Sequence, residues 1–474
     1  MLRKLALAVV VVALAVVGAV VAQRRLGGGA PNAGSSHRLA EIDARVWPFP
    51  QAIDEAADYL VRVTGPDGRF EYRRFVDGHP DSTGQYNVLR HAGSIYALAD
   101  YALADRRGRT GNVDGPEQAH AALGRASSYL VSRYVRPLRE HPEILAVWSD
   151  QREERSRGGR PTAKLGGAGL AIVALAGNMR VNAAVAPSAS ASASADAGAG
   201  DLATMQGLGR FILFMQRENG SFHAKYEDPT GYVRDAESLF YPGEAILALT
   251  MLYEVDRDAR WLEGAARGIA QLIESRRGST NLPADHWLMI AIDRFVPHHA
   301  ALAKAPVSSE EMVEHAIALG RLMMNDQADV LATLDDPKIA GAFDADGRTT
   351  PAATRLEGLL ALEHAIASDP ARAAFRTELR GVIGRGIAFL RRSQVQDGVA
   401  RGGIPWMQRG AFSKQTAVDA SDVADDEGSA ARTEQEVRID YVQHALSAML
   451  RYAVMCRDRG AGCAPGVAST DAAP

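Results

Sequence analysis

Hydrophobic positions divide the chain into two kinds of predicted helix. Some segments are apolar only along a stripe spaced i, i+3, i+4, i+7, which is typical of a helix with one exposed face. Four such stripes are Ile53, Ala56, Ala57, Leu60; Leu208, Phe211, Ile212, Met215; Leu262, Ala265, Ala266, Ile269; and Leu379, Val382, Ile383, Ile387. Six other stretches begin with polar residues and are then apolar on nearly every side: 87–103, 164–176, 241–253, 285–296, 355–366 and 438–455. A helix that is apolar all round must be buried on all sides.

The two kinds of segment alternate along the chain, which predicts a degenerate repeat of helical hairpins. Each one-sided helix would cover a buried one, and six such pairs can close into a ring. The predicted fold is therefore all-α, an (α/α)6 toroid of alternating outer and inner helices. A closed ring can form a single core, so we expect one domain over residues 47–457, although 474 residues could hold two or three domains.

Three segments are expected to lie outside this core. Residues 187–200 are small and of low complexity, so we predict a disordered insert there. Residues 414–433 are rich in Asp, Ala and Ser and are predicted to form a mobile excursion. Residues 458–474 contain almost no core-forming residues and are predicted to be a disordered tail.

The amino terminus has the pattern of an export segment. Arg3 and Lys4 precede an uncharged apolar run over residues 5–22, and Arg24 and Arg25 follow it. Residues 1–25 are predicted to be a signal anchor or a signal peptide, and residues 26–46 a flexible tether. We favour a single membrane anchor with the body periplasmic or extracellular; the alternative is secretion after cleavage.

Charge and cysteine content narrow the possible partners. The chain has 57 acidic and 53 basic residues without a basic block, so nucleic acid is not expected as a partner. Its two cysteines, Cys456 and Cys463, are too few for a thiolate zinc site and predict a local disulfide or two free thiols. No phosphate-binding loop, H-E-x-x-H or G-x-S-x-G motif is present, so no metal or other cofactor is expected.

Polar residues at the starts of the predicted inner helices are the candidate site. In such a ring all inner helices begin on the same face. Burying so many polar groups there costs stability, so their presence favours a functional role. The candidate acids, bases and nucleophiles are His91, Tyr241, Glu244, Asp285, Glu357 and His444. The candidate substrate-binding residues at these starts are Arg90, Lys164, His286, Arg355 and Asp440. Tyr226 is added from the segment 222–226, which is predicted to form the rim of the ring's mouth.

Several of these residues also have a purely structural interpretation. Asp285 directly precedes an apolar run and is a candidate N-cap, while Glu244 and Glu357 in a first turn would complement the helix dipole. His91 or His444 alone could be a hydrogen-bonded core histidine. Asp440 and His444 are four residues apart, so they share a helix face and could form only a salt bridge.

The alternation of helices resembles the superfamily of α/α toroids that includes terpenoid cyclases, prenyltransferases and polysaccharide-acting enzymes. Within it, the sequence Tyr241-Pro242-Gly243-Glu244 followed by an apolar helix is similar to the D-glucuronyl C5-epimerase C-terminal family, in which a Tyr-Pro-Gly-Glu turn opens an inner helix. The cyclase branch uses an Asp-x-Asp-Asp motif, which is missing here. The prenyltransferase branch uses an Asp, Cys and His zinc site, and neither cysteine lies at an inner-helix start.

The resemblance therefore implies a carbohydrate-active protein. Our main hypothesis is an exported enzyme acting on an envelope or extracellular polysaccharide, in which Arg90, Lys164 and Arg355 neutralise a uronate carboxylate. Proton abstraction would make it an epimerase or a lyase. Two carboxylates, Glu244 with Asp285 or Glu357, would make it a glycoside hydrolase. The alternative is a non-catalytic glycan-binding or assembly module of the envelope, and isoprenoid chemistry is a third, less favoured hypothesis.

Overall fold

The computed structural model describes residues 49–79, 81, 83–105, 115–150, 153, 160–185, 191–333, 336–408 and 436–459. The predicted anchor and tether (1–46), the predicted excursion (414–433) and nearly all of the predicted tail lie outside these residues. All described residues belong to one compact unit, Val46–Pro474.

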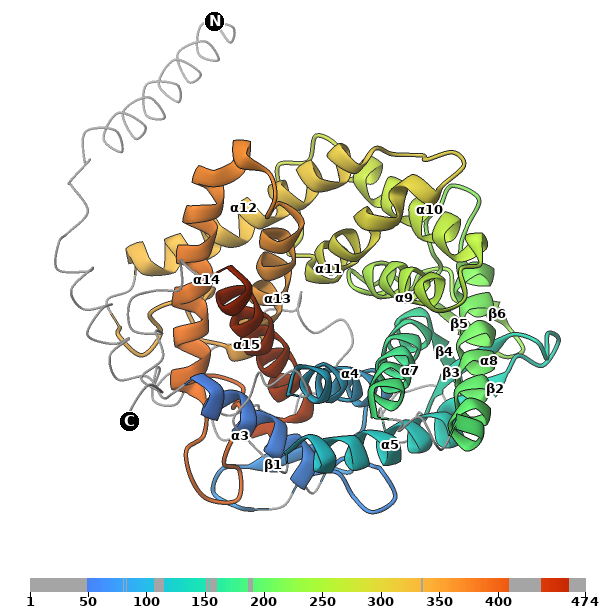
Figure 1. Cartoon of the computed structure of the whole chain (residues 1–474), viewed down its shortest axis with the longest axis horizontal. Coiled ribbons are helices and arrows are strands. Elements are labelled where there is room, and N and C mark those ends of the chain that lie inside the picture. Colours follow the sequence, from blue (N-terminus) through green and yellow to red (C-terminus); the bar gives the residue numbers. More distant parts are fainter. Residues whose placement is uncertain are drawn as a thin grey trace, which may run out of the picture. The chain divides into compact units, whose positions relative to one another are not determined.

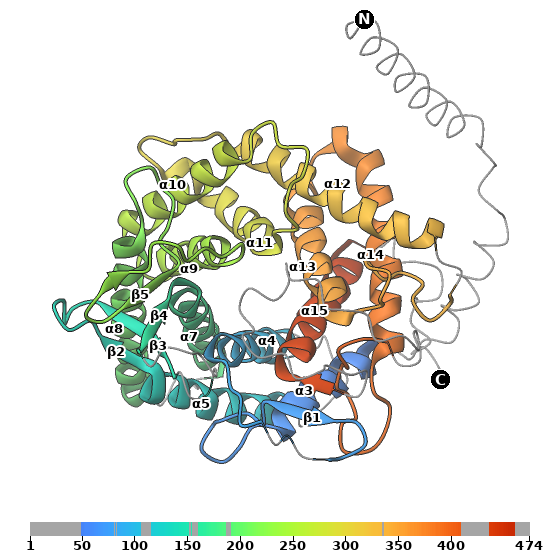
Figure 2. The ribbon, with the colours of Figure 1, turned by 180° about the vertical axis from the view of Figure 1, so that it is seen from behind.

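Twelve α-helices of the described residues alternate between an outer and an inner layer (Figure 1). The outer helices are α3 (Phe49–Arg62), α5 (Gly115–Tyr134), α8 (Ala191–Met215), α10 (Ala259–Ser275), α12 (Ser309–Thr333) and α14 (Ala373–Ser393). The inner helices are α4 (Val88–Asp105), α7 (Leu165–Val185), α9 (Tyr241–Asp256), α11 (His286–Phe295), α13 (Thr349–Ala365) and α15 (Ile439–Arg459). The view from behind shows the same two concentric layers (Figure 2).

The inner helices form a closed ring. Each contacts the next one in the chain, and the last, α15, contacts the first, α4. The predicted outer stripes explain how the second layer attaches, because all sixteen of their residues are buried. The prediction of an (α/α)6 toroid is confirmed.

Two small sheets connect the segments that lead into the inner helices. Strand β1 (Arg73–Phe75) pairs antiparallel with β7 (Glu436–Arg438), and this pairing joins the first and last helical hairpins. The second sheet has the order β2-β3-β4-β5-β6 and comprises β2 (Val135–Pro137), β3 (Leu145–Ser149), β4 (Thr162–Lys164), β5 (Lys225–Glu227) and β6 (Gly231–Tyr232). Strands of two to five residues are too short to give a period-two pattern, so the all-α prediction did not include them.

Glycine turns end two outer helices as the sequence suggests. Gly68 and Gly220 have φ angles of +91° and +90°, a region that L side chains rarely adopt. A Cβ atom would lie 2.1 Å from the Arg125 carbonyl oxygen at Gly68, and 2.5 Å from that of Arg267 at Gly220. These turns therefore pack directly against the next outer helix, and only glycine fits both the conformation and the contact.

Two predicted boundaries are wrong. Helix α13 begins at Thr349, six residues before the predicted start of the all-round apolar stretch at Arg355, because its first turns pack on the loop around Trp406. Residues 191–200 were predicted to be part of a disordered insert but form the first turns of α8. Their alanines have the highest helix propensity, and this local preference outweighs the low complexity of the segment.

Helix α7 is the one described helix that is long and apolar enough to cross a membrane. In its most apolar window, 67% of the residues are buried inside the protein. Its position in the inner ring accounts for this composition, because an inner helix is covered by protein on every side.

Candidate functional site

Three of the predicted site residues lie together: His286 of α11, Glu357 of α13 and His444 of α15. One nitrogen or oxygen atom from each lies within 4.8 Å of those of the other two. We call these three residues the histidine cluster. His286 and Glu357 are buried, and the side chain of His444 is 13% exposed. Three different inner helices supply the cluster, so the closed ring is what brings it together.

Glu357 orients the imidazole of His444. Its Oε2 atom lies 2.6 Å from His444 Nδ1, a distance typical of a charge-assisted hydrogen bond. A carboxylate can only accept here, so it favours the tautomer in which Nδ1 carries the proton. His444 Nε2 is then left to accept a proton from another group.

His286 lies in an apolar environment with no hydrogen-bond partner among the described residues for either ring nitrogen. Its ring packs edge-on against Phe240 at 5.2 Å and beside Trp287 at 5.1 Å, measured between ring centroids. The His444 ring is 5.6 Å away at an interplanar angle of 77°. Burial, reinforced by electrostatic interactions with His444, Arg355 and Arg451, lowers the pKa of His286 well below its usual range.

Arg451 and Tyr96 continue this polar region along the ring. Arg451 is seven residues after His444 on α15, which places both on the same helix face. Arg451 Nη2 donates to Tyr96 Oη at 2.5 Å. Burial acts to lower the pKa of Arg451, but Tyr96 and acidic groups including Glu357 raise it above its usual value. A permanent positive charge therefore lies near the histidine cluster.

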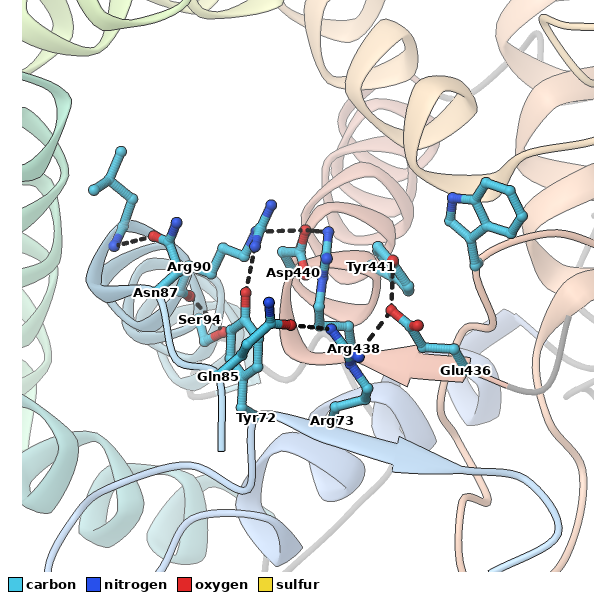
Figure 3. A network of polar contacts seen from close by, with 12 residues as sticks. Tyr72, Arg73, Gln85, Asn87, Arg90, Ser94, Glu436, Arg438, Asp440 and Tyr441 are labelled. Atoms are coloured by element: carbon cyan, nitrogen blue, oxygen red, sulfur yellow. Dashed lines mark hydrogen bonds and ion pairs between the residues drawn. The ribbon is translucent and has the colours of Figure 1, made fainter. Parts of the chain in front are cut away.

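Arg90 and Asp440 belong to a neighbouring ionic network beside β1 and β7 (Figure 3). Asp440 accepts two hydrogen bonds from Arg438, at 2.7 and 3.0 Å, and its Oδ2 atom lies 3.1 Å from Arg90 Nε. Arg90 also donates to Tyr72 Oη. These contacts link the start of α4 to the start of α15, so both predicted binding residues hold the ring closed.

Two further charged candidates have partners on outer elements. Asp285 accepts the backbone N–H of Leu288 at 3.0 Å, which makes it the N-cap of α11, and its other oxygen accepts from Arg276 at 2.7 Å. Arg355 Nε donates to Asp326 Oδ2 of α12 at 2.9 Å. Both side chains are thereby engaged in contacts that fasten an inner helix to the outer layer.

His91 and Tyr226 do not join the histidine cluster. The His91 ring bridges Tyr86 Oη at 2.6 Å and the Ala126 carbonyl oxygen of α5 at 2.9 Å, so it points into the outer layer. Burial lowers the pKa of His91 to about 4, so the core contains it as a neutral imidazole. Tyr226 packs against Phe214 of the outer helix α8 and against Tyr232.

Lys164, Tyr241 and Glu244 lie between the starts of α7 and α9, and all three are buried. Tyr241 and Glu244 pack against Gly166: a Cβ atom added there would lie 2.5 Å from Tyr241 Cδ1 and 2.1 Å from Glu244 Oε2. Gly166 therefore makes room for both side chains. This group forms a second polar region at the helix starts.

The double role of Asp285 gives a stability prediction. We expect Asp285→Asn to lower the free energy of unfolding by about 3–5 kcal/mol, because the charge of Arg276, which is only 11% exposed, would lose its counter-charge. Urea unfolding of the full chain measures this. Asp258→Asn is the matched control, since Asp258 is also an N-cap paired with an arginine but Arg260 is 65% exposed. A loss of about 1 kcal/mol or less is expected there, and equal losses would contradict the structural role of Asp285.

Sequence reasoning missed several residues that shape the cluster. Phe240 and Trp287 enclose His286 from the starts of α9 and α11, but both are apolar, and the charged Arg451 lies well beyond the start of α15. The seven-residue spacing from His444 was the signal that could have identified Arg451. The resulting arrangement offers one oriented base, one imidazole with free nitrogens and a nearby cation. Within the described residues the same three side chains are also the group that could hold a metal ion.

No protein-family model matches the chain, and no curated protein matches it. Solved structures with the same fold do match. A D-mannose isomerase superposes with a TM-score of 0.54 at 10% identity, covering 85% of this chain and 97% of that one. Cellobiose 2-epimerase from Bacillus thermoamylovorans gives 0.53 at 10% identity, covering 84% and 95%. A GH76 α-mannanase from Bacteroides thetaiotaomicron gives 0.50 at 12% identity, covering 88% and 98%.

At these identities the likeness establishes the fold. The chain is an α/α toroid of the kind found in sugar epimerases, sugar isomerases and GH76 mannanases. The finer similarity to the C5-epimerase family, suggested by Tyr241-Pro242-Gly243-Glu244, is not among these findings. A shared fold does not determine function, which depends on the residues of the site.

Proposed function

We propose that this chain is a sugar-modifying enzyme that transfers a proton on a carbon atom, as an epimerase or an isomerase does. The observation that carries the proposal is the histidine cluster: two imidazoles 5.6 Å apart, one of them oriented by a buried carboxylate at 2.6 Å. An imidazole held in one tautomer by a carboxylate is the usual general base of enzymes. The toroids of D-mannose isomerase and cellobiose 2-epimerase are consistent with this chemistry.

In the proposed reaction His444 Nε2 takes a proton from a carbon next to a sugar carbonyl. Glu357 stabilises the imidazolium that forms. His286 donates an N–H hydrogen bond to the oxygen on which negative charge develops, and its apolar surroundings strengthen that bond. Return of the proton to the other face of the same carbon gives an epimer, and its return to the neighbouring carbon gives an isomer.

The surrounding charges support a neutral sugar better than a uronate. Arg90 and Arg355, which were expected to neutralise a uronate carboxylate, are already paired with Asp440 and Asp326. Glycoside hydrolysis is less well supported, because it needs two available carboxylates and Asp285 is bound to Arg276.

A survey of sugars tests the proposal. The purified full chain would be incubated with reducing mono- and disaccharides, with uronate-containing polymers and with α-mannan, and the products identified by chromatography and NMR. Conversion of a reducing sugar to its epimer or keto-isomer supports the proposal. Shortening of the polymers would instead identify a hydrolase or lyase, and binding without any conversion would identify a glycan-binding module.

We also propose that the enzyme acts outside the cytoplasmic membrane. The support is the positively flanked apolar run at residues 5–22. Alkaline phosphatase fused after Ser36 should therefore be active. A β-galactosidase fusion at the same position is the control and should be inactive. The reverse pattern would place the protein in the cytoplasm.

A further inference from the structure

The histidine cluster has the composition of a transition-metal site. It contains two imidazoles and one carboxylate, each offering one donor atom within 4.8 Å of the other two. Imidazole together with carboxylate is a ligand set of Zn²⁺, Fe²⁺ and Co²⁺, whereas Mg²⁺ and Ca²⁺ prefer oxygen ligands alone. The residues come from α11, α13 and α15 and are 71 and 87 positions apart in sequence. No local sequence motif therefore predicts the site.

Several donor atoms of the cluster are buried without a partner. In the described part of the chain, both ring nitrogens of His286 lack a hydrogen-bond partner, and so does the Oε1 atom of Glu357. His286 is 2% exposed and Glu357 is 0% exposed. A buried polar atom without a partner destabilises the fold, and this cost is recovered when a ligand occupies the site.

The distances are compatible with an ion after the side chains move closer. In a tetrahedral site, bonds of about 2.0–2.2 Å from imidazole nitrogen or carboxylate oxygen to Zn²⁺ place two ligand atoms about 3.3–3.6 Å apart. The donor atoms lie within 4.8 Å of one another, so the widest pair would need to close by about 1.2–1.5 Å. Three protein ligands leave a coordination position open for water.

We propose that His286, Glu357 and His444 bind a divalent transition-metal ion, and that the metal and the sugar exclude each other. The second part rests on the proposed function, because the ion occupies the nitrogen atoms that proton transfer needs. The first part does not depend on it. A metal-loaded cluster would therefore be an inhibited form of the enzyme.

Titration of the EDTA-treated and desalted full chain with Co²⁺ tests the binding. The visible absorption of the bound ion and calorimetry report stoichiometry and affinity without any sugar. We expect one tight ion per chain and at least a ~100-fold weaker affinity in His286→Leu and in Glu357→Gln, since loss of even an outer-shell contact costs 10–100-fold. The control His223→Gln, on a partly exposed histidine between α8 and β5, should bind as wild type does.

The outcomes separate the two proposals. Absence of tight binding, or equal binding in wild type, His286→Leu and Glu357→Gln, would overturn the metal site whether or not the enzyme converts a sugar. Binding without any sugar conversion would leave the metal site standing and refute only the proposed function. With an active sugar, Co²⁺ should raise the apparent KM and leave kcat unchanged. A requirement for Co²⁺ in turnover would overturn the mutual exclusion.

Discussion

Replacing His444 with glutamine is expected to lower kcat/KM for the converted sugar by about 10²–10⁴-fold, the usual contribution of a general base. The substituted amide retains an N–H group that can donate to Glu357, so the buried carboxylate keeps a partner and the fold should persist. Steady-state kinetics combined with a thermal melt measure both effects.

The matched control is His91→Gln, the same substitution at a buried histidine of a different inner helix. There the ring bridges Tyr86 and the Ala126 carbonyl oxygen, so its loss should lower the melting temperature and leave kcat/KM of the folded protein within a few-fold of wild type. If His444→Gln kept its activity within ~10-fold, His444 would not be the base.

Asp440→Asn is expected to be the most destabilising of the substitutions considered, at about 3–5 kcal/mol or more of unfolding free energy. The carboxylate is buried and is contacted by both Arg438 and Arg90, so one buried guanidinium group and one that is 17% exposed would lose their counter-charge. Asp326→Asn is the control. Its carboxylate is 31% exposed beside Arg355, and a loss of about 1 kcal/mol or less is expected.

The effect of Asp440→Asn should depend on pH. Burial acts to raise the pKa of Asp440, but the charges of Arg438 and Arg90 outweigh it and hold the pKa well below its usual range. The stabilisation is therefore complete above the ordinary pKa of aspartate and is lost as the pH falls towards the lowered value. The difference between wild type and variant in urea unfolding should shrink with decreasing pH below about 4. A constant difference would show that the ion pair is not its cause.

The fold could be predicted because it depends on which faces of each helix are buried, and the spacing of apolar residues indicates those faces directly. The stripe Leu208, Phe211, Ile212, Met215 is buried as predicted, and so are most residues of the all-round segments. The strands β1 and β7 could not be predicted, since three residues give no period and their pairing spans most of the chain. The start of α13 was misplaced because its first residues owe their helical conformation to a tertiary contact with Trp406.

The candidate site was predicted only as a pool of residues. The shared position at predicted inner-helix starts selected His286, Glu357 and His444, and eight other candidates with them. The candidates differ in their tertiary partners. Asp285 is paired with Arg276, and His91 is hydrogen-bonded to the Ala126 carbonyl oxygen. These partners lie on outer helices or on loops. The closed ring determines which of them come close to each candidate, and the spacing of residues in the sequence does not predict these contacts.

The most direct test of the account follows hydrogen exchange with solvent. The full chain would be incubated in D₂O with the sugar that it converts, and ¹H NMR would follow the proton on the carbon next to the carbonyl. Proton transfer through His444 predicts that deuterium appears at the reacting carbon of product and recovered substrate at a rate comparable to turnover. The same experiment with His444→Gln should show neither exchange nor product. Conversion without deuterium incorporation, or exchange that survives in His444→Gln, would contradict proton transfer by the histidine cluster.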